Sequence, residues 1–145
     1  MAAAETDKRT AASQSGGHST IEDLQEWKIL WTARPNVLVT GLPDAVEQSL
    51  AALMPHLAVP VCDWTPDVLQ RRPGEMKTLV IHDVDALSPE HQGALSAWLD
   101  RPAVGRTQVV STTNAPLFPR VVAGLFREEL YYRLNTLVLG ARPGA

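Results

Sequence analysis

Residues 78–85 read Thr-Leu-Val-Ile-His-Asp-Val-Asp, a run of four apolar or β-branched residues followed directly by polar ones. The first half is the strongest strand signal in the chain, because such a run is typical of a buried strand. Ser88 then stands where a helix N-cap is expected, and Pro89 suits the first helical turn. The stretch predicts a strand that leads into a helix ending before Arg101, with an apolar face made of Ala94, Leu95, Trp98 and Leu99.

The same alternation continues on both sides of this stretch. Amphipathic spacing predicts helices over 44–53 and about 124–134, and another that begins at Thr20 and carries Ile21, Leu24, Trp27, Leu30 and Trp31. Strands that alternate with helices indicate an α/β fold with three layers and a parallel five-stranded sheet. Pro60 cannot donate a backbone hydrogen bond, so its strand is expected at a sheet edge. The four further strands are predicted at 36–40, 59–62, 108–112 and 136–139.

The chain is predicted to form one domain with a tail at each end. Its 145 residues are about one domain's worth, and its hydrophobic content of 45% is near the globular average. Residues 1–19 are rich in Ala, Ser, Thr and Gly without an apolar period, which predicts a flexible tail. The α/β domain is expected over 20–141, and a short C-terminal tail over 142–145.

Cysteine content and hydropathy bear on the compartment. The single cysteine, Cys62, excludes an internal disulfide and a cysteine-based zinc site, which suits a reducing environment. Every apolar run is far shorter than the roughly 18 residues that span a bilayer, and the N-terminus does not resemble a signal peptide. We therefore expect a cytoplasmic protein that does not associate with membranes.

Charge is distributed unevenly along the chain. Residues 1–100 carry 7 basic and 14 acidic side chains, a net charge of −7, whereas residues 101–145 carry 6 basic and 2 acidic ones, a net charge of +4. The two parts are expected to attract each other, within one chain or between copies, so self-association is an expectation. Direct DNA binding is not expected, because it requires a basic surface over the whole domain.

The turn after the first predicted strand argues against phosphate binding. In parallel sheets, sites lie at the carboxyl ends of the strands. A phosphate loop at this place needs several backbone N–H groups and a lysine. Here the turn reads Gly41-Leu42-Pro43-Asp44, with one glycine, no lysine, and a carboxylate where the phosphate charge would lie. Pro43 and Asp44 also make an ordinary helix start.

The third strand ends in acids that resemble a Walker B segment, where carboxylates hold Mg²⁺ and orient the attacking water. Its two acidic positions are occupied by His82 and Asp83, with Asp85 two residues later. A metal held by His82 with one of these aspartates is the alternative to a plain polar strand end. Adjacent strand residues point to opposite faces, so we expect no metal and no cofactor. Asn114 either orients a water at this edge or belongs to a turn.

Residues 125–135 read Leu-Phe-Arg-Glu-Glu-Leu-Tyr-Tyr-Arg-Leu-Asn. Spacing alone predicts a helix with a core face of Phe126, Leu130 and Leu134 and a charged outer face. Arg127 and Arg133 are six residues apart, about 240° around an ideal helix, so they do not share one stripe.

This segment closely resembles the FRE[DE]LYYRLN signature of the AAA+ domain of bacterial enhancer-binding proteins, the activators of sigma-54 RNA polymerase. Residues 78–99 are similar to that family's Walker B strand and the helix after it, 109–114 to its sensor I strand, and 36–41 to the strand before its Walker A loop. The resemblance covers about residues 20–140. It implies a P-loop NTPase sheet of the AAA+ type, in a degenerate and truncated sigma-54 interaction domain.

The resemblance also implies that most catalytic positions are lost. Gly41 to Asp44 stand in place of the Walker A loop, and His82 and Asp83 replace the Mg²⁺-linked aspartate and the catalytic glutamate. Only 14 residues separate Cys62 from Lys77, which leaves no room for the family's GAFTGA insertion. The helical lid with its sensor II arginine is expected to be missing too. Positions that match the family are Asn114 at sensor I, and Arg127 and Arg133 as arginine fingers toward a neighbouring subunit.

The sequence therefore predicts a non-catalytic, AAA+-like bacterial regulatory protein rather than an ATPase. It is expected to inhibit, sequester or modulate a protein partner, either an AAA+ subunit or an unrelated client, in sigma-54-linked transcription control. The alternative is a sigma-54-type transcriptional regulator that binds ATP weakly, using Asp83 and Asn114.

Overall fold

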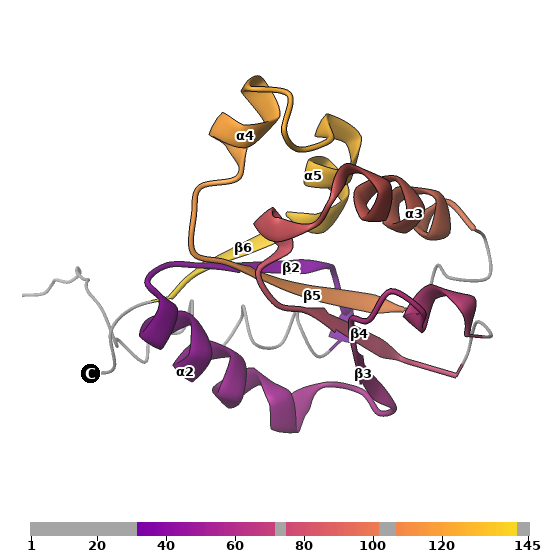
Figure 1. Cartoon of the computed structure of the whole chain (residues 1–145). Coiled ribbons are helices and arrows are strands. Elements are labelled where there is room, and N and C mark those ends of the chain that lie inside the picture. The colour runs from indigo at the N-terminus through magenta and orange to yellow at the C-terminus, as the bar shows by residue number, and fades with distance from the viewer. Residues whose placement is uncertain (1–31, 72–74, 102–106, 142–145) are drawn as a thin grey trace, which may run out of the picture.

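A computed structural model describes residues 32–71, 75–101 and 107–141 (Figure 1). Neighbouring strands are all parallel, in the order β3-β4-β5-β2-β6. This order confirms the parallel five-stranded sheet and places the strand that follows Pro60 at an edge. Within the described ranges the strands are β2 (Val37–Thr40), β3 (Val61–Asp63), β4 (Thr78–Ile81), β5 (Gln108–Thr113) and β6 (Leu137–Gly140).

Helices cover both faces of the sheet, which gives the three predicted layers (Figure 1). Helix α2 (Pro43–Leu53) lies on one face, whereas α3 (Pro89–Leu99), α4 (Phe118–Val122) and α5 (Glu128–Leu134) lie on the other. Single 3-10 turns add η1 (Met54–His56), η2 (Val68–Gln70) and η3 (Val84–Ala86). The helix expected over 20–31 and the tails at 1–19 and 142–145 fall outside the described residues.

The strands are apolar on both sides because each side has its own core. On the α2 side, Val37 and Val39 pack with the helix residues Val46, Leu50 and Leu53. On the opposite side, one buried cluster joins strand residues to α3 and α5, and it includes Leu38, Leu79, Ile81, Val109, Leu95, Trp98, Leu130 and Leu134. Burial on both faces is what produces continuous apolar runs instead of alternating ones.

Helix α3 begins where the sequence predicted, but its buried face differs from the predicted apolar face. The Ser88 hydroxyl accepts a hydrogen bond from the His91 N–H at 3.1 Å, as expected of an N-cap. Ala94, however, is exposed, and Gln92 lies on the buried face instead. Prediction by hydropathy missed Gln92 because its side chain is buried through hydrogen bonds to the backbone.

The prediction of a single helix over about 124–134 is wrong for its first turn. Helix α5 begins at Glu128, and α4 ends before Gly124, whose φ of 78° is a left-handed conformation that closes a helix. The Arg120 carbonyl accepts the N–H groups of Leu125 and Phe126, which fixes the loop between the two helices. The predicted core face of α5 is confirmed, since Phe126, Leu130 and Leu134 are all buried.

Candidate functional site

The carboxyl ends of β2 and β5 meet where the strand order reverses. These strands are neighbours, but the chain leaves β2 for the far edge at β3 and leaves β5 for β6 on the other side of β2. Both connections leave the sheet at the left in Figure 1. Ligand sites of open parallel sheets lie at such a reversal. The candidate site is therefore formed by residues 40–44 and 112–115, together with the end of β4.

The turn after β2 is short and held against the end of β6. Only Gly41 and Leu42 separate β2 from α2. The Gly41 N–H donates to the Thr113 carbonyl at 3.4 Å, and the Ala141 N–H donates to the Thr40 carbonyl at 2.6 Å. Gly41 has a φ of 147°, and a Cβ at this position would lie 2.8 Å from the Ala141 carbonyl oxygen.

This turn offers a phosphate little to bind. Leu42 occupies the N-cap of α2 with 68% of its surface exposed, and Pro43, at the first helical position, has no N–H to donate. Asp44 lies exposed in the first turn of the helix, where it already complements the helix dipole. The arrangement is a tight strand-to-helix connection and lacks the wide loop of N–H groups that surrounds a phosphate.

Asp83 and Asn114 come together across β4 and β5. The Asn114 side-chain amide donates to Asp83 Oδ1 at 3.2 Å, and the Asp83 N–H donates to the Thr112 hydroxyl at 3.1 Å. Asp83 has a φ of 52°, which turns the chain sharply into η3. The structure thus brings together two residues that the sequence assigned to one edge.

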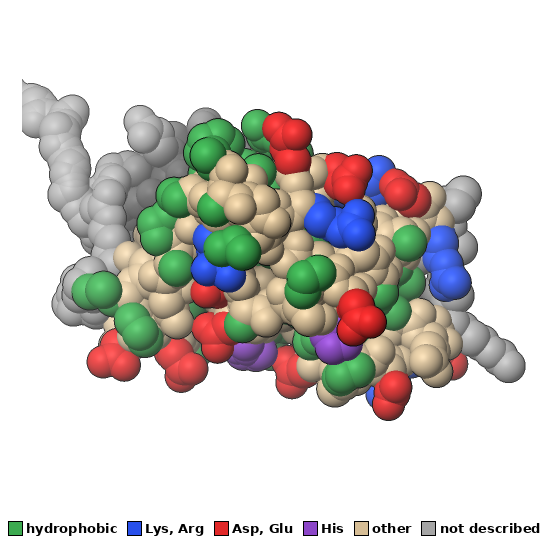
Figure 2. Space-filling view, turned by 45° about the horizontal axis from the view of Figure 1, so that its top comes forward, with side chains coloured by type: hydrophobic (Ala, Val, Ile, Leu, Met, Phe, Trp, Pro, Cys, Tyr) green, Lys and Arg blue, Asp and Glu red, His purple; other side chains and the backbone are tan. Residues whose placement is uncertain are grey.

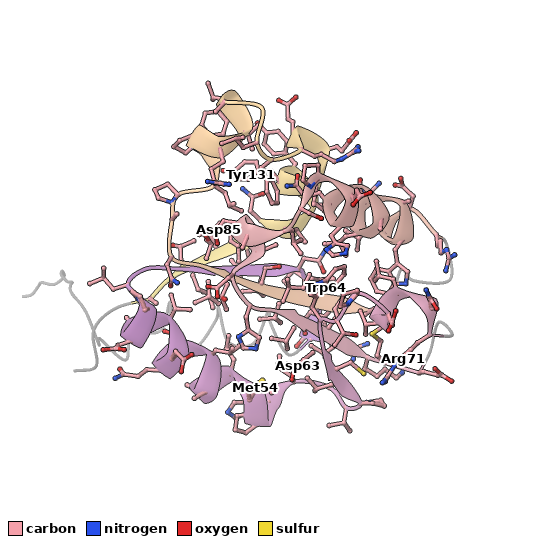
Figure 3. All side chains as sticks on the ribbon, viewed as in Figure 1. Met54, Asp63, Trp64, Arg71, Asp85 and Tyr131 are labelled. Atoms are coloured by element: carbon pink, nitrogen blue, oxygen red, sulfur yellow. The ribbon has the colours of Figure 1, made fainter. Side chains whose placement is uncertain are left out.

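Asp85 is held by the last residue of β5. The Thr113 hydroxyl lies 3.0 Å from Asp85 Oδ1 and 2.7 Å from the Ala115 carbonyl oxygen. In Figure 3, Asp85 lies between the sheet and Tyr131, on the side of the sheet that carries α5. The sequence prediction missed the roles of Thr112 and Thr113, although two β-branched hydroxyl residues at a strand end are a signal for such contacts.

His82 does not join the two aspartates that follow it. Its Nε2 atom lies 3.7 Å from Asp63 Oδ1, and both side chains are exposed. Within the described ranges, no group of three or more His, Cys, Asp or Glu side chains is placed to hold a metal ion. The carboxylates of Asp83 and Asp85 instead accept hydrogen bonds from neighbouring side chains of the sheet edge.

Arg127 lies at the start of α5 and against α3. Its N–H donates to Gln92 Oε1 at 2.9 Å, and its Nη1 atom lies 3.4 Å from Glu129 Oε1. A Cβ at Gly93 would lie 3.0 Å from Arg127 Nη2, so the absence of a side chain there makes room for the guanidinium. Gln92 is 2% exposed and also donates to the carbonyls of Leu87 and Leu125, which joins α3 to the loop before α5.

Arg133 lies at the other end of α5, near the amino ends of the strands. Its guanidinium forms an ion pair with Asp100 at the end of α3. Its carbonyl accepts a hydrogen bond of 3.0 Å from Asn36, the residue before β2. The two arginines therefore lie at opposite ends of α5, and only Arg127 lies near the carboxyl edge.

An apolar surface adjoins the site. Beside the carboxyl ends of β2 and β6 lies a hollow of about 400 Å³, lined by Leu38, Thr40, Gly41, Asn114, Ala115, Pro116, Leu117, Phe118, Tyr131, Asn135 and Val138. Figure 2 shows hydrophobic side chains gathered over this part of the surface, next to a group of charged ones. Phe118 and Val138 of this lining are exposed, as are Val122 of α4, Leu125 of the loop after it and Tyr132 of α5, and we call these five residues the apolar patch.

Comparison with models of protein families shows to which family the chain belongs. The profile of the sigma-54 interaction domain matches residues 32–142, well over half of the sequence. The chain belongs to the sigma-54 interaction domain family. No curated protein sequence matches significantly. Within the described residues of this sigma-54 interaction domain, no helix is long and apolar enough to cross a membrane.

Solved structures show the same fold. NtrX from Brucella abortus in complex with ATP matches with a TM-score of 0.64 at 17% identity, over 88% of this chain and 36% of NtrX. The P-loop NTPase domain of the sigma-54 transport activator from E. coli matches with a TM-score of 0.56 at 15% identity, over 88% of this chain and all of that domain. Domain III of the replication initiator DnaA from Thermotoga maritima matches with a TM-score of 0.53 at 14% identity, over 90% of this chain and 65% of that one.

These matches confirm the P-loop NTPase fold of the AAA+ type that the sequence predicted. The sigma-54 interaction domain described here spans about a third of the length of NtrX.

Proposed function

We propose that this chain is a non-catalytic, AAA+-like regulatory module, a pseudo-ATPase of the bacterial cytoplasm that acts by binding a protein partner. The observation that carries the proposal is the turn after β2. Gly41 and Leu42 form the whole connection, and Gly41 is packed against Ala141. A triphosphate bound by this fold needs a loop of N–H groups and a lysine, which supply much of the electrostatic stabilisation for phosphoryl transfer.

Calorimetry with ATP and Mg²⁺ tests the loss of nucleotide binding. We expect no binding tighter than a Kd of about 100 μM, which corresponds to roughly 5.5 kcal/mol. A tighter complex would overturn the proposal. The E. coli domain that matches over its full length is a suitable positive control for the measurement.

The exposed surface supports a role in protein binding. The apolar patch includes Leu125, two residues before the half-exposed Arg127, and exposed apolar side chains gathered on a surface are typical of an interaction site. The partner is an AAA+ subunit, which the chain would cap by presenting Arg127, or an unrelated client that it sequesters. Arg133 contributes less to this role, because Asp100 of the same chain already pairs with it.

An ATPase assay on a sigma-54 activator domain distinguishes these partners. If the chain caps an AAA+ ring, increasing amounts should inhibit that ATPase, and Arg127→Ala should relieve the inhibition. Arg101→Ala is the matched control, since Arg101 is exposed just after α3, toward the amino ends of the strands and away from the candidate site. Inhibition that is equal for wild type and Arg127→Ala would exclude the arginine-finger role, whereas absence of inhibition by the wild type would leave the client alternative.

One observation favours the second candidate, a regulator that binds ATP weakly. Asn114 and Asp83 keep a direct contact of 3.2 Å at the edge where a nucleotide would lie. If this contact serves nucleotide, ATP binding should be measurable in the wild type and lost in Asn114→Ala. Persistence of the same weak binding in that variant would assign it to another surface.

A further inference from the structure

Strand β6 is one edge of the sheet, and part of its backbone faces away from β2. The N–H groups of Leu137 and Ala141 donate to carbonyls of the segment 36–40, which contains β2. The backbone groups of successive strand residues point to opposite sides of the strand, so those of Val138 and Gly140 point outward. Within the described ranges no strand pairs with them, since the sheet order ends at β6.

The two edges of the sheet differ in their protection against pairing with another chain. At the β3 edge, Pro60 directly precedes the strand and Asp63 ends it. Proline and charge are devices by which edge strands avoid such pairing. At the β6 edge, residues 134–141 contain no charged side chain and no proline. The β6 edge is therefore the one that can accept a further strand.

The outward groups of β6 are complementary to those of a second copy of β6. In an antiparallel pair, two residues that lie directly opposite each other can exchange both of their N–H···O bonds. When two copies of β6 run antiparallel around a two-fold axis at Leu139, Val138 of each copy lies opposite Gly140 of the other. Every outward N–H and C=O of both strands then gains a partner.

The side chains of β6 fit the same arrangement. Val138 lines the hollow on the α5 side and is 50% exposed, whereas a Cβ at Gly140 would meet nothing within 4 Å. The open space at Gly140 can therefore receive Val138 of the other copy. On the α2 side, the half-buried Leu139 of each copy would contact its equivalent across the axis.

Charges at the two ends of β2 favour the antiparallel direction. On the α2 side of the sheet, Arg34 precedes this strand and Asp44 follows it, in the first turn of α2. Antiparallel pairing places the amino end of one sheet beside the carboxyl end of the other, so opposite charges share each end of the joined sheet. Parallel pairing would place like charges at the same end.

We propose that two copies of this chain pair through β6, antiparallel around Leu139, and continue the sheet across a two-fold axis. A contact of this symmetric kind closes after two copies. The pairing covers Val138 of the apolar patch and does not involve Arg127. It goes beyond the proposed function and does not depend on it.

Disulfide formation between copies tests the position of the axis. Cys62→Ala removes the single cysteine and provides the background. In it, Leu139→Cys should form a covalent dimer under mild oxidation, because residues directly opposite each other have Cβ atoms about 4.5–5.5 Å apart. Val138→Cys is the matched control. It is more exposed, but it would lie diagonal to its equivalent, about 7–8 Å away, and should form little covalent dimer.

The other outcomes of the oxidation are equally definite. More covalent dimer from Val138→Cys than from Leu139→Cys would overturn the proposed pairing. Little covalent dimer from both variants, with circular dichroism like that of the wild type, would also overturn it.

Sedimentation velocity of the full chain tests whether the backbone carries the contact. The wild type should form a dimer whose fraction rises with concentration. Val138→Pro should weaken dimerisation by at least about tenfold, because it removes an N–H that faces the partner rather than β2, and symmetry removes it from both copies. Val138→Thr keeps this N–H and the β-branched shape, so it should still form the dimer.

Three results of this measurement would contradict the pairing. They are a wild type that stays monomeric at every concentration, a dimer that Val138→Pro leaves unchanged, and equal weakening by Val138→Pro and Val138→Thr. Equal weakening would assign the contact to the Val138 side chain instead of its backbone.

Discussion

Gly41 is the residue on which the closed turn after β2 depends. We predict that Gly41→Ala lowers the free energy of unfolding by about 1–3 kcal/mol, because the added Cβ would meet the Ala141 carbonyl and φ is in the region that favours glycine. Denaturant unfolding measures the loss. Gly140→Ala is the matched control, since a Cβ there meets nothing within 4 Å. Equal stabilities of the two variants would contradict this account of the turn.

Gln92 is buried because its amide satisfies three backbone groups. Gln92→Ala removes the partners of the Leu87 and Leu125 carbonyls and of the Arg127 N–H. We expect a loss of about 2–4 kcal/mol in unfolding free energy, since buried groups without partners are costly. Gln48→Ala, on the exposed side of α2, should change it little. A small effect of Gln92→Ala would mean that water replaces the amide.

The residues of the candidate site were predictable in type and in place, but not in their contacts. Walker B and sensor I patterns brought Asp83 and Asn114 to one edge, and the structure joins them. The contacts of Thr112 and Thr113 were missed because hydroxyl residues at a strand end indicate that a contact exists without showing which partner each one reaches. Only the register of β4 against β5 shows which carboxylate each hydroxyl reaches.

At the scale of elements, a substitution in the contact between α3 and α5 should change stability and partner binding in opposite directions. Gly93→Ala should raise the free energy of unfolding by up to about 1 kcal/mol, because alanine is the better helix former. The new methyl group would displace the flexible Arg127 guanidinium rather than backbone. We therefore predict that Gly93→Ala is more stable than the wild type but inhibits an AAA+ ATPase less strongly. Inhibition that persists unchanged would show that Arg127 does not depend on this contact.

Elements were predictable where the apolar pattern is strong and where it is unbroken. The five strands and α2 follow from their β-branched runs and from amphipathic spacing. The loop between α4 and α5 did not, because Gly124 and the Arg120 carbonyl fix it through backbone geometry that hydropathy does not encode. Helix α4 was missed for a related reason, since it has only five residues, none of them buried, and so short a segment carries little periodicity.

At the scale of the whole molecule, charge should govern association. Residues 1–100 and 101–145 carry net charges of −7 and +4. We predict that self-association or binding to an AAA+ partner weakens between about 50 mM and about 500 mM salt, as the screening length falls from roughly 14 Å to about 4 Å. Sedimentation velocity measures this. Association that is independent of salt would assign the contact to the apolar patch instead.

The contact between Gly41 and Ala141 has a consequence for the history of the domain. Lengthening the connection after β2 would drive new residues into the backbone that leaves β6, so both segments would have to change together. In the descent of this domain the turn can therefore lengthen only together with the segment after Gly140, whereas exposed side chains elsewhere can change independently of this contact.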